Sequence, residues 1–331
     1  MSTGSGSIFC PCSRSENEAV VNDRQHSLED KNRPGAADRI SGATGSTVLK
    51  DEPLSRHTSF GIGGPADLYI RPASEKDLAV VLGIIRQYGM GLMVIGRGTN
   101  ILVGDGGFRG AVVDLRGACR RLEHQGEKVI AGAGVTVSEL LDYCLSQELG
   151  GLEFMAGIPG SVGGAVRVNA GAWGSAVGDR IEAVRGYDPA GRGVDMERSE
   201  LQFSYRQARF PDHLIITEVR LSLQPEKAGA IAGKMDDYRR RRRHQPIDQK
   251  SAGSVFKNPS SAPAGRLIEA AGCKGLRVDG AQVSPQHANF IINLGEATAA
   301  AVRELIDQVR LKVREDSGVE LEMEIICVGE E

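Results

Sequence analysis

A cluster of glycines constrains this chain more than any other feature of its sequence. The cluster lies between residues 151 and 174, with glycine at 151, 157, 160, 163, 164, 171 and 174. Glycine allows positive φ angles and lets the backbone contact a ligand directly. Consecutive backbone N–H groups can then line a site for an anion such as a diphosphate. Neither the dinucleotide pattern G-x-G-x-x-G nor a G-x-x-x-x-G-K-[ST] loop occurs, so the segment predicts a backbone-lined site outside the Rossmann fold.

Length and composition leave room for two or three domains of an ordinary globular protein. The chain has 331 residues, of which 40% are hydrophobic and 25% charged. A net charge of −3 gives no overall attraction to nucleic acid or membranes. No apolar run is long enough to span a bilayer, and the N-terminus lacks the basic start and apolar core of a secretory signal. We therefore expect a cytoplasmic protein with no membrane partner.

The cysteines give no sign of a metal site. Of the six cysteines, only Cys10 and Cys12 are close in sequence, and no second pair at zinc spacing accompanies them. We expect reduced thiols and no bound metal.

Local patterns before residue 150 predict an α+β arrangement with a mixed sheet. Residues 1–48 are rich in small and polar residues without periodicity, which predicts a disordered extension. Helices are expected after Ser74 and Thr136, each followed three residues later by an acidic residue as in a capping box. Apolar runs predict strands at 92–95, 111–115 and 129–131.

The second half of the chain continues with mixed elements. Strands are expected at 181–187 and 214–223, and a boundary at Gln224-Pro225 separates them from a helix over 226–243 that Pro246 ends. The remaining expected elements are helices at 264–271 and 298–315 and strands at 289–293 and 319–328, the last with alternating apolar and glutamate residues.

Five segments together resemble one known family. They span residues 57–67, 96–102, 151–174, 251–259 and 280–290, in the family's order. Over residues 54–329 the chain is similar to the UDP-N-acetylenolpyruvoylglucosamine reductases, also called UDP-N-acetylmuramate dehydrogenases, the flavoenzymes of peptidoglycan precursor synthesis. Residues 187–222 are too few for the inserted loop with an extra substrate-contacting tyrosine, so the resemblance is to the shorter, type II branch.

The resemblance implies both a fold and a reaction. The fold would be α+β, with an FAD-binding lobe of the vanillyl-alcohol-oxidase type in two subdomains, 49–118 and 119–225, and a C-terminal α/β substrate-binding domain, 226–331. NADPH would reduce FAD, and the flavin N5 would deliver hydride to UDP-N-acetylglucosamine enolpyruvate, giving UDP-N-acetylmuramate. The protein would supply a positioned acid and charge stabilisers, while FAD carries the redox chemistry. No obligate protein partner is implied.

Three residues match the family's catalytic positions. Ser254, in a Gly-Ser-x-Phe motif, would donate the proton, although a serine there can also simply cap a turn. Arg206 would hold the substrate carboxylate with two parallel hydrogen bonds and stabilise the enolate, although it can also be a surface residue at a strand end.

Glu324 would complete this set and, with Arg206, stabilise the enolate, by polarising the proton donor or by positioning a water near the carboxylate, although a glutamate on such a strand can also lie on a solvated face. The neighbouring Glu322 remains a rival, because alternation places it on the same face of an extended strand. Ser251 is the alternative serine to Ser254.

Ligand-binding positions follow from the same match. The absence of a flavin-tethering motif with histidine or cysteine predicts non-covalent FAD. The expected FAD contacts are Gly96, Gly98, Thr99, Asn100, Ile101, Leu102, Ile158, Pro159, Gly160, Ser161, Gly163, Gly164, Val166, Asn169 and Arg241. The expected substrate contacts are Tyr205, Lys257, Asn258, Gln282, His287 and Asn289, with His287 in a structural hydrogen-bonding role.

Two other classes of protein stay open from the sequence. An FAD oxidase of the same fold would transfer electrons to oxygen. A binding module would either sense a UDP-sugar or bind nucleic acid through the five arginines at 239–243. Within a helix, consecutive arginines spread around the axis, which disfavours a nucleic-acid surface.

Overall fold

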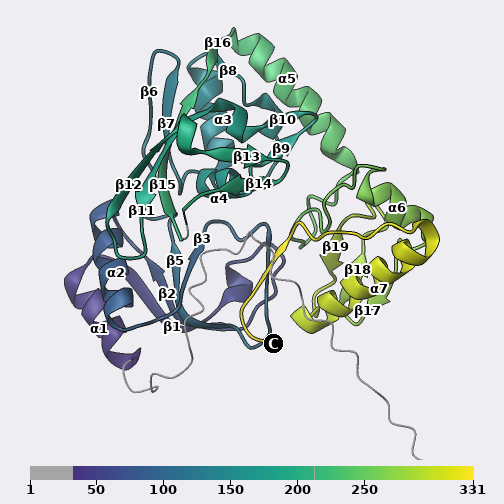
Figure 1. The fold of residues 1–331 in the computed structure, drawn as a ribbon, viewed down its shortest axis with the longest axis horizontal. Coiled ribbons are helices and arrows are strands. Elements are labelled where there is room, and N and C mark those ends of the chain that lie inside the picture. The colour runs from purple at the N-terminus through teal and green to yellow at the C-terminus, as the bar shows by residue number, and fades with distance from the viewer. Residues whose placement is uncertain (1–32, 212) are drawn as a thin grey trace, which may run out of the picture.

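The structure is a computed structural model that describes residues 33–211 and 213–331. Figure 1 shows two sheet-containing units from the first two thirds of the chain and a third unit that carries the C-terminal helices. This architecture confirms the predicted α+β class, in which two subdomains precede a C-terminal domain. Within the described residues, no helix combines the length and the apolar character needed to cross a membrane.

The first unit is a mixed sheet covered by two helices. Its strand order is β1-β2-β5-β3, where β1 pairs antiparallel with β2 and the other pairs are parallel. The strands are β1 (Thr47–Pro53), β2 (Pro65–Arg71), β3 (Leu92–Ile95) and β5 (Phe108–Asp114), and the helices are α1 (Arg33–Ala43) and α2 (Glu75–Gln87). As predicted, Ser74 caps α2, and its side chain accepts a hydrogen bond from the Asp77 N–H.

Helix α1 corrects the prediction of disorder through residue 48. Ala36, Ala37 and Ile40 are buried against the main core, and β1 begins at Thr47. The small and polar residues around these three positions concealed a short apolar stripe, which tertiary packing stabilises. Residues 1–32, including Cys10 and Cys12, lie outside the described residues.

The second unit is an antiparallel sheet with the strand order β12-β11-β15-β7-β6. These strands are β6 (Leu122–Gln125), β7 (Lys128–Gly132), β11 (Ile181–Tyr187), β12 (Gly193–Glu197) and β15 (Ile215–Ser222). Helices α3 (Val137–Ser146) and α4 (Val162–Arg167) pack beside the sheet, and α3 begins with the predicted capping box of Thr136 and Glu139. Shorter pairs are β8 (Leu149–Gly150) with β16 (Gln224–Pro225), β9 (Gly171–Ala172) with β10 (Ser175–Ala176), and β13 (Gln202–Ser204) with β14 (Gln207–Arg209).

Helix α5 (Ala228–Arg241) belongs with the second unit rather than with the C-terminal domain, to which the sequence analysis assigned it. Ile231 and Met235 are buried in the same core as α3 and the second sheet, and α5 packs on η3 (Glu153–Met155). In Figure 1 the helix runs from the second unit toward the third. We therefore propose a boundary after this helix, near residue 244.

The third unit has its own hydrophobic core and contacts the first unit through core packing and strand pairing. It contains α6 (Ala264–Ala270), α7 (Ala299–Ser317) and the strands β17 (Arg277–Val278), β18 (Ala281–Val283) and β19 (Ile291–Asn293). Phe60, Ile62 and Leu102 from the first unit are part of this core. Finally, β20 (Ile326–Val328) pairs in parallel with β4 (Ile101–Val103) of the first unit.

The predicted strand over 319–328 is regular only in its last three residues. Leu321 and Ile325 are buried as the alternation predicts. However, the segment bonds to a loop instead of a strand, through the Glu324 N–H to the Val255 carbonyl at 2.8 Å and the Lys257 N–H to the Glu322 carbonyl at 2.8 Å. The side-chain periodicity was therefore predictable, whereas the absence of a continuous strand partner was not.

Candidate active site

A large cavity of about 1580 Å³ is lined by residues of all three units. Its lining comes from segments far apart in the sequence, which the fold brings together. These are residues 93–101 of the first unit, 157–173 and 214–216 of the second, and 245–254, 286–290 and 324 toward the C-terminus.

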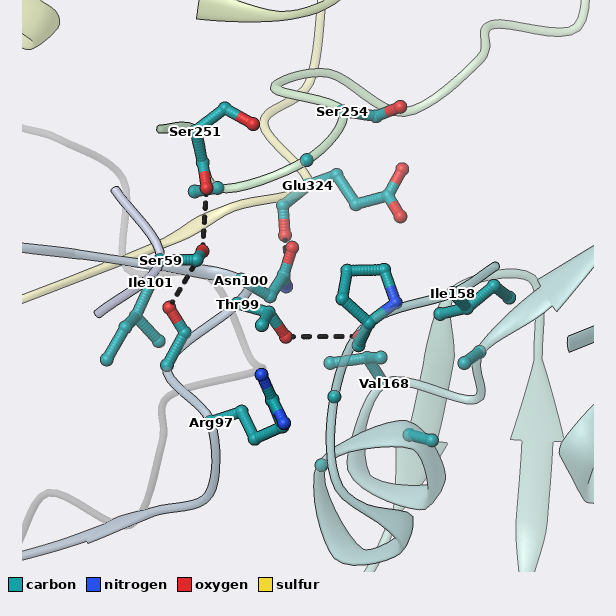
Figure 2. Close-up of a pocket in the computed structure, with 18 of the residues that line it drawn as sticks. Ser59, Arg97, Thr99, Asn100, Ile101, Ile158, Val168, Ser251, Ser254 and Glu324 are labelled. Atoms are coloured by element: carbon teal, nitrogen blue, oxygen red, sulfur yellow. Dashed lines mark hydrogen bonds between the residues drawn. The ribbon is translucent and has the colours of Figure 1, made fainter. Parts of the chain in front are cut away.

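One wall of the cavity is made of backbone from two glycine-rich loops. A Cβ at Gly96 would lie 2.2 Å from the Ser161 Oγ, and one at Gly98 would lie 2.4 Å from the His57 carbonyl oxygen. The φ angles of Gly98, Gly157 and Gly160 are +58°, +83° and +146°, which favour glycine. The Thr99 hydroxyl donates to the Pro159 carbonyl at 3.3 Å and joins the loops, as Figure 2 shows.

Two of the expected polar FAD contacts also hold this wall together. The Ser161 Oγ accepts a hydrogen bond from the Gly164 N–H at 3.3 Å and caps α4. The Asn100 side-chain N–H donates to the Glu324 carbonyl at 3.1 Å. Both residues line the cavity, so they can contact a ligand while fixing the two loops.

Most of the expected FAD contacts line the cavity, and four do not. Those that do are Gly96, Gly98, Thr99, Asn100, Ile101, Ile158, Pro159, Gly160, Ser161, Gly163 and Gly164. Leu102 and Val166 are instead fully buried in hydrophobic cores. Asn169 is buried, donates to the Ser204 carbonyl and accepts from the Gly178 N–H. The fourth, Arg241, does not line the cavity, whereas the next residue, Arg242, does.

Arg242, rather than Arg241, faces the cavity from the end of the arginine run. Its guanidinium donates from Nε to the Ala156 carbonyl at 2.9 Å and from Nη2 to the Phe154 carbonyl at 3.1 Å. Burial and the nearby Arg206 lower the pKa of Arg242 to about 10, so it remains charged at neutral pH. Arg241 lies over the rings of Trp173 and Tyr238. Arg242 also lies over the Trp173 ring, whereas Arg239 and Arg240 form ion pairs with Asp236 and Asp237.

The predicted catalytic arginine and glutamate meet in the cavity. Arg206 lies at the tip of the β13–β14 hairpin with a φ of +55°, a conformation that is strained for a non-glycine residue and is common at functional sites. Its Nε lies 2.9 Å from the Glu324 carboxylate, and the two side chains are 23% and 14% exposed. Burial raises the pKa of Glu324, although Arg206 and Lys257 oppose that shift.

Ser254 lies on the loop that is bonded to the Glu324 segment. Gly253, with a φ of +80°, turns the chain just before it, and the next residue, Val255, accepts the Glu324 N–H. In Figure 2 the Ser254 and Glu324 side chains extend in the same direction from adjacent segments. Ser251 lies nearer Ser59, whose hydroxyl donates to the Ser251 carbonyl at 2.6 Å.

Glu322, the rival of Glu324, does not line the cavity. It forms an ion pair with Lys257, and its side chain is 69% exposed. Lys257, an expected substrate contact, is likewise absent from the lining.

The other expected substrate contacts are divided. Asn258, His287 and Asn289 line the cavity. Gln282 instead donates to the Gly275 carbonyl at 3.2 Å. Tyr205 is 58% exposed on the hairpin tip, where its hydroxyl accepts the Asn258 N–H at 3.4 Å.

Asn289 and His287 both have clear structural contacts. The Asn289 side chain bonds to both the N–H and the carbonyl of Phe256, at 3.0 and 2.8 Å, and so fixes the loop that carries Ser254. The His287 Nδ1 accepts the Asn289 N–H at 3.3 Å, and burial lowers the pKa of His287. The lowered pKa and this hydrogen bond support a neutral, structural role for His287.

Sequence reasoning missed a buried charged network on the first unit. Asp114, which is fully buried, accepts from the Tyr69 hydroxyl at 2.6 Å and from Arg71 and Arg116. Arg116 also lines the cavity. The signal was present as a charged pair, Asp114 and Arg116, at the end of an apolar strand.

The cavity is strongly cationic. Nine arginine and lysine side chains line it, against three carboxylates. A cavity of about 1580 Å³ with a glycine-rich wall and excess positive charge fits a dinucleotide carrying a diphosphate. The residues present therefore fit FAD.

The site and the comparisons with known proteins first define a class, that of FAD-binding proteins. A family model described as an FAD-binding domain matches residues 66–197. A second model, described as the C-terminal domain of UDP-N-acetylenolpyruvoylglucosamine reductase, matches residues 245–328.

Curated proteins and a solved structure identify the family. The UDP-N-acetylenolpyruvoylglucosamine reductase of Moorella thermoacetica is 47% identical over 86% of this chain and 94% of its own length. That of Syntrophus aciditrophicus is 39% identical over 89% and 96%. The crystal structure of the Thermus caldophilus enzyme has a TM-score of 0.72 at 35% identity and covers 85% of this chain and 98% of its own. The chain belongs to the UDP-N-acetylenolpyruvoylglucosamine reductase family and is an oxidoreductase, as the sequence predicted.

Proposed function

We propose that the protein reduces UDP-N-acetylglucosamine enolpyruvate to UDP-N-acetylmuramate, with FAD as a non-covalent cofactor and NADPH as the electron donor. The observation that carries this proposal is the Arg206–Glu324 ion pair at 2.9 Å, beside Ser254, in a cationic cavity next to an FAD-binding domain. A carboxylate-bearing substrate is the ligand that such a site would attract.

Arg206 is proposed to bind the enolpyruvyl carboxylate. A guanidinium presents five N–H donors in a planar fork, so it can contact Glu324 and a substrate carboxylate together. Negative charge develops next to that carboxylate as the double bond accepts hydride, and a fixed cation stabilises that charge. Arg242 lines the same cavity and adds a second positive charge, and the charge of Arg206 contributes to lowering the pKa of Arg242.

Ser254 is proposed to deliver the proton that completes the reduction. The chemistry that FAD supplies when bound is hydride transfer, so the protein must place an acid at the carbon that receives no hydride. The Ser254 loop is fixed by Asn289 and by the Glu324 N–H. Glu324, which forms an ion pair with Arg206 on the segment next to that loop, is proposed to polarise the proton donor or to position a water near the substrate carboxylate.

The two glycine loops are proposed to bind FAD through their backbone, and the C-terminal domain is proposed to bind the UDP-sugar. The loops at 96–100 and 157–161 are cross-linked by Thr99 and Pro159, which keeps the wall rigid. Of the expected substrate contacts, Asn258, His287 and Asn289 line the cavity.

An anaerobic visible spectrum tests the proposal directly. Purified protein with FAD receives NADPH and then UDP-N-acetylglucosamine enolpyruvate. Flavin bands that bleach with NADPH and return with the substrate are expected. Flavin that stays reduced until air is admitted would instead indicate an oxidase. Failure to bind FAD at all would favour a UDP-sugar binding module.

A further inference from the structure

The cavity has two ends with different surroundings. At the catalytic end, Ser254, Arg206 and Glu324 come together beside the C-terminal domain. The inner end lies between the sheets of the first and second units. There the lining comes from β3, Leu115, Ala133 and the start of β15. Within the first unit the Leu115 N–H bonds to the Ile95 carbonyl, and within the second unit the Ala133 N–H bonds to the Thr217 carbonyl.

Arg167 lines the cavity from the last turn of α4, which packs on β7, β14 and β15. Its guanidinium lies 5.7 Å from the centre of the Phe210 ring. Throughout residues 33–211 and 213–331, no hydrogen bond or ion pair to its side chain is found. Burial lowers the pKa of Arg167, and no carboxylate opposes that shift. An arginine that is partly removed from water without a partner is costly for the protein alone.

The other arginines and lysines of the cavity differ from Arg167. Arg116, at the same inner end, is held by Asp114 at 2.8 Å and by the Tyr69 hydroxyl at 3.3 Å. Three more form no ion pair within residues 33–211 and 213–331, but they are exposed to solvent, which lowers the cost of an unpaired charge. They are Arg97, Lys250 and Arg266. Arg167 is therefore the half-buried cation whose charge most needs a ligand.

The position of Arg167 indicates which part of a cofactor it would meet. The redox ring must lie at the catalytic end, because hydride transfer requires contact with the substrate. The rest of the dinucleotide then extends to the inner end, where Arg167 lies. We propose that Arg167 binds the phosphate-bearing ADP half of FAD. This inference rests on the proposed function for the location of the redox ring.

Binding measurements on flavin-free protein test the proposal without relying on turnover. The variants are Arg167→Met, Arg167→Lys and, as a control with the same charge change, Arg240→Met, which removes a surface partner of Asp237 outside the cavity. The probes are FAD, riboflavin and ADP, followed by flavin fluorescence and calorimetry. Thermal unfolding of each flavin-free variant checks that the fold is retained.

Arg167→Met is expected to weaken FAD and ADP binding by about 10- to 100-fold, the range for a lost charge-assisted hydrogen bond. Riboflavin binding is expected to stay within about twofold, since riboflavin has no phosphate. Arg167→Lys should recover part of the loss, and Arg240→Met should bind as the wild type.

Unchanged FAD and ADP affinity in Arg167→Met would overturn the proposal. An equal loss for riboflavin would also overturn it, because Arg167 would then act on the ring half. A wild type that binds neither FAD nor ADP overturns this proposal and the proposed function together. If Arg167→Met loses affinity for FAD and ADP but not for riboflavin, and the wild type shows no reductase turnover, only the proposed function is overturned.

Discussion

The two walls of the cavity are built from different parts of the polypeptide. The wall at 96–100 and 157–161 is backbone, brought close by glycines and joined by Thr99 and Pro159. The opposite wall, from the C-terminal domain and the β13–β14 hairpin, presents side chains, of which Ser254, Arg206 and Glu324 are central. We propose that the two walls have different roles, in which the first wall binds the cofactor and the second acts on the substrate.

The largest effect is expected from Ser254→Ala, which removes only a hydroxyl from the side-chain wall. Turnover should fall by about 10²- to 10⁴-fold, the range for loss of a positioned acid. FAD affinity and the rate of flavin reduction by NADPH should remain near wild-type values, and stopped-flow absorbance resolves the two half-reactions. Normal turnover would remove Ser254 from the mechanism. Ser251→Ala, on the same loop, is the matched control.

Arg206→Lys should follow, with a loss of about 10- to 100-fold in kcat/KM. Lysine keeps the charge but cannot form two parallel hydrogen bonds to a carboxylate. Steady-state kinetics with varied enolpyruvyl substrate measures the effect. Arg185→Lys, which alters a surface ion pair with Asp195, should leave kcat/KM unchanged. Near wild-type kinetics in Arg206→Lys would show that Arg206 is not the carboxylate clamp.

Gly96→Ala tests the backbone wall. The added methyl would lie 2.2 Å from the Ser161 Oγ, so the α4 cap must move, at a cost of about 1–3 kcal/mol. FAD affinity should fall about tenfold, whereas the FAD-saturated enzyme keeps most of its kcat. Fluorescence titration and kinetics at high FAD separate these effects. A lower kcat with normal FAD affinity would contradict the division between the walls.

The control for that substitution is Gly233→Ala, because the space around Gly233 in α5 is open. Alanine is favoured over glycine within a helix by about 1 kcal/mol, so this variant should be slightly more stable and bind FAD normally.

The smallest effect expected is an uptake of protons when the enolpyruvyl substrate binds the oxidised enzyme. Burial raises the pKa of Glu324 above its usual value, and the charge of Arg206 limits that rise. A substrate carboxylate that shares Arg206 adds negative charge, so the pKa of Glu324 rises further and the site gains up to about one proton. Substrate affinity should therefore fall as the pH rises from the pKa of Glu324 in the free enzyme to its higher pKa in the substrate complex.

Calorimetry in buffers of different ionisation enthalpy measures that uptake. Glu324→Gln should abolish it, and Glu322→Gln should not. Equal uptake in wild type and Glu324→Gln would mean that another group titrates.

Much of both walls could be predicted from the sequence, for different reasons. Gly98 and Gly160 have backbone angles that few other residues tolerate, so the glycine pattern marks the loops. Ser254, Arg206 and Glu324 came from a family resemblance, since nothing in their spacing shows that a hairpin and a C-terminal segment meet. Arg241 was preferred to Arg242 because sequence matching does not fix helical phase, and one residue rotates a side chain by about 100°.

The remaining errors arose where tertiary contacts decided the structure. Helix α1 has only three core residues, Ala36, Ala37 and Ile40, and its stability comes from the sheet and α2 that it covers. Residues 319–325 alternate like a strand but bond to the loop around Val255. In both cases the segments that these residues pack against or bond to, rather than their own sequence, determined the secondary structure.

The pairing of β20 with β4 has a consequence for synthesis on the ribosome. Strand β4 ends at Val103, and its partner β20 begins only at Ile326, so more than two hundred residues are translated between them. Glu324 lies just before β20, whereas both glycine loops are complete by residue 164. A growing chain therefore completes both glycine loops long before the proposed catalytic carboxylate of Glu324 is synthesised, and the edge of the first unit at β4 gains its last strand partner only when β20 emerges.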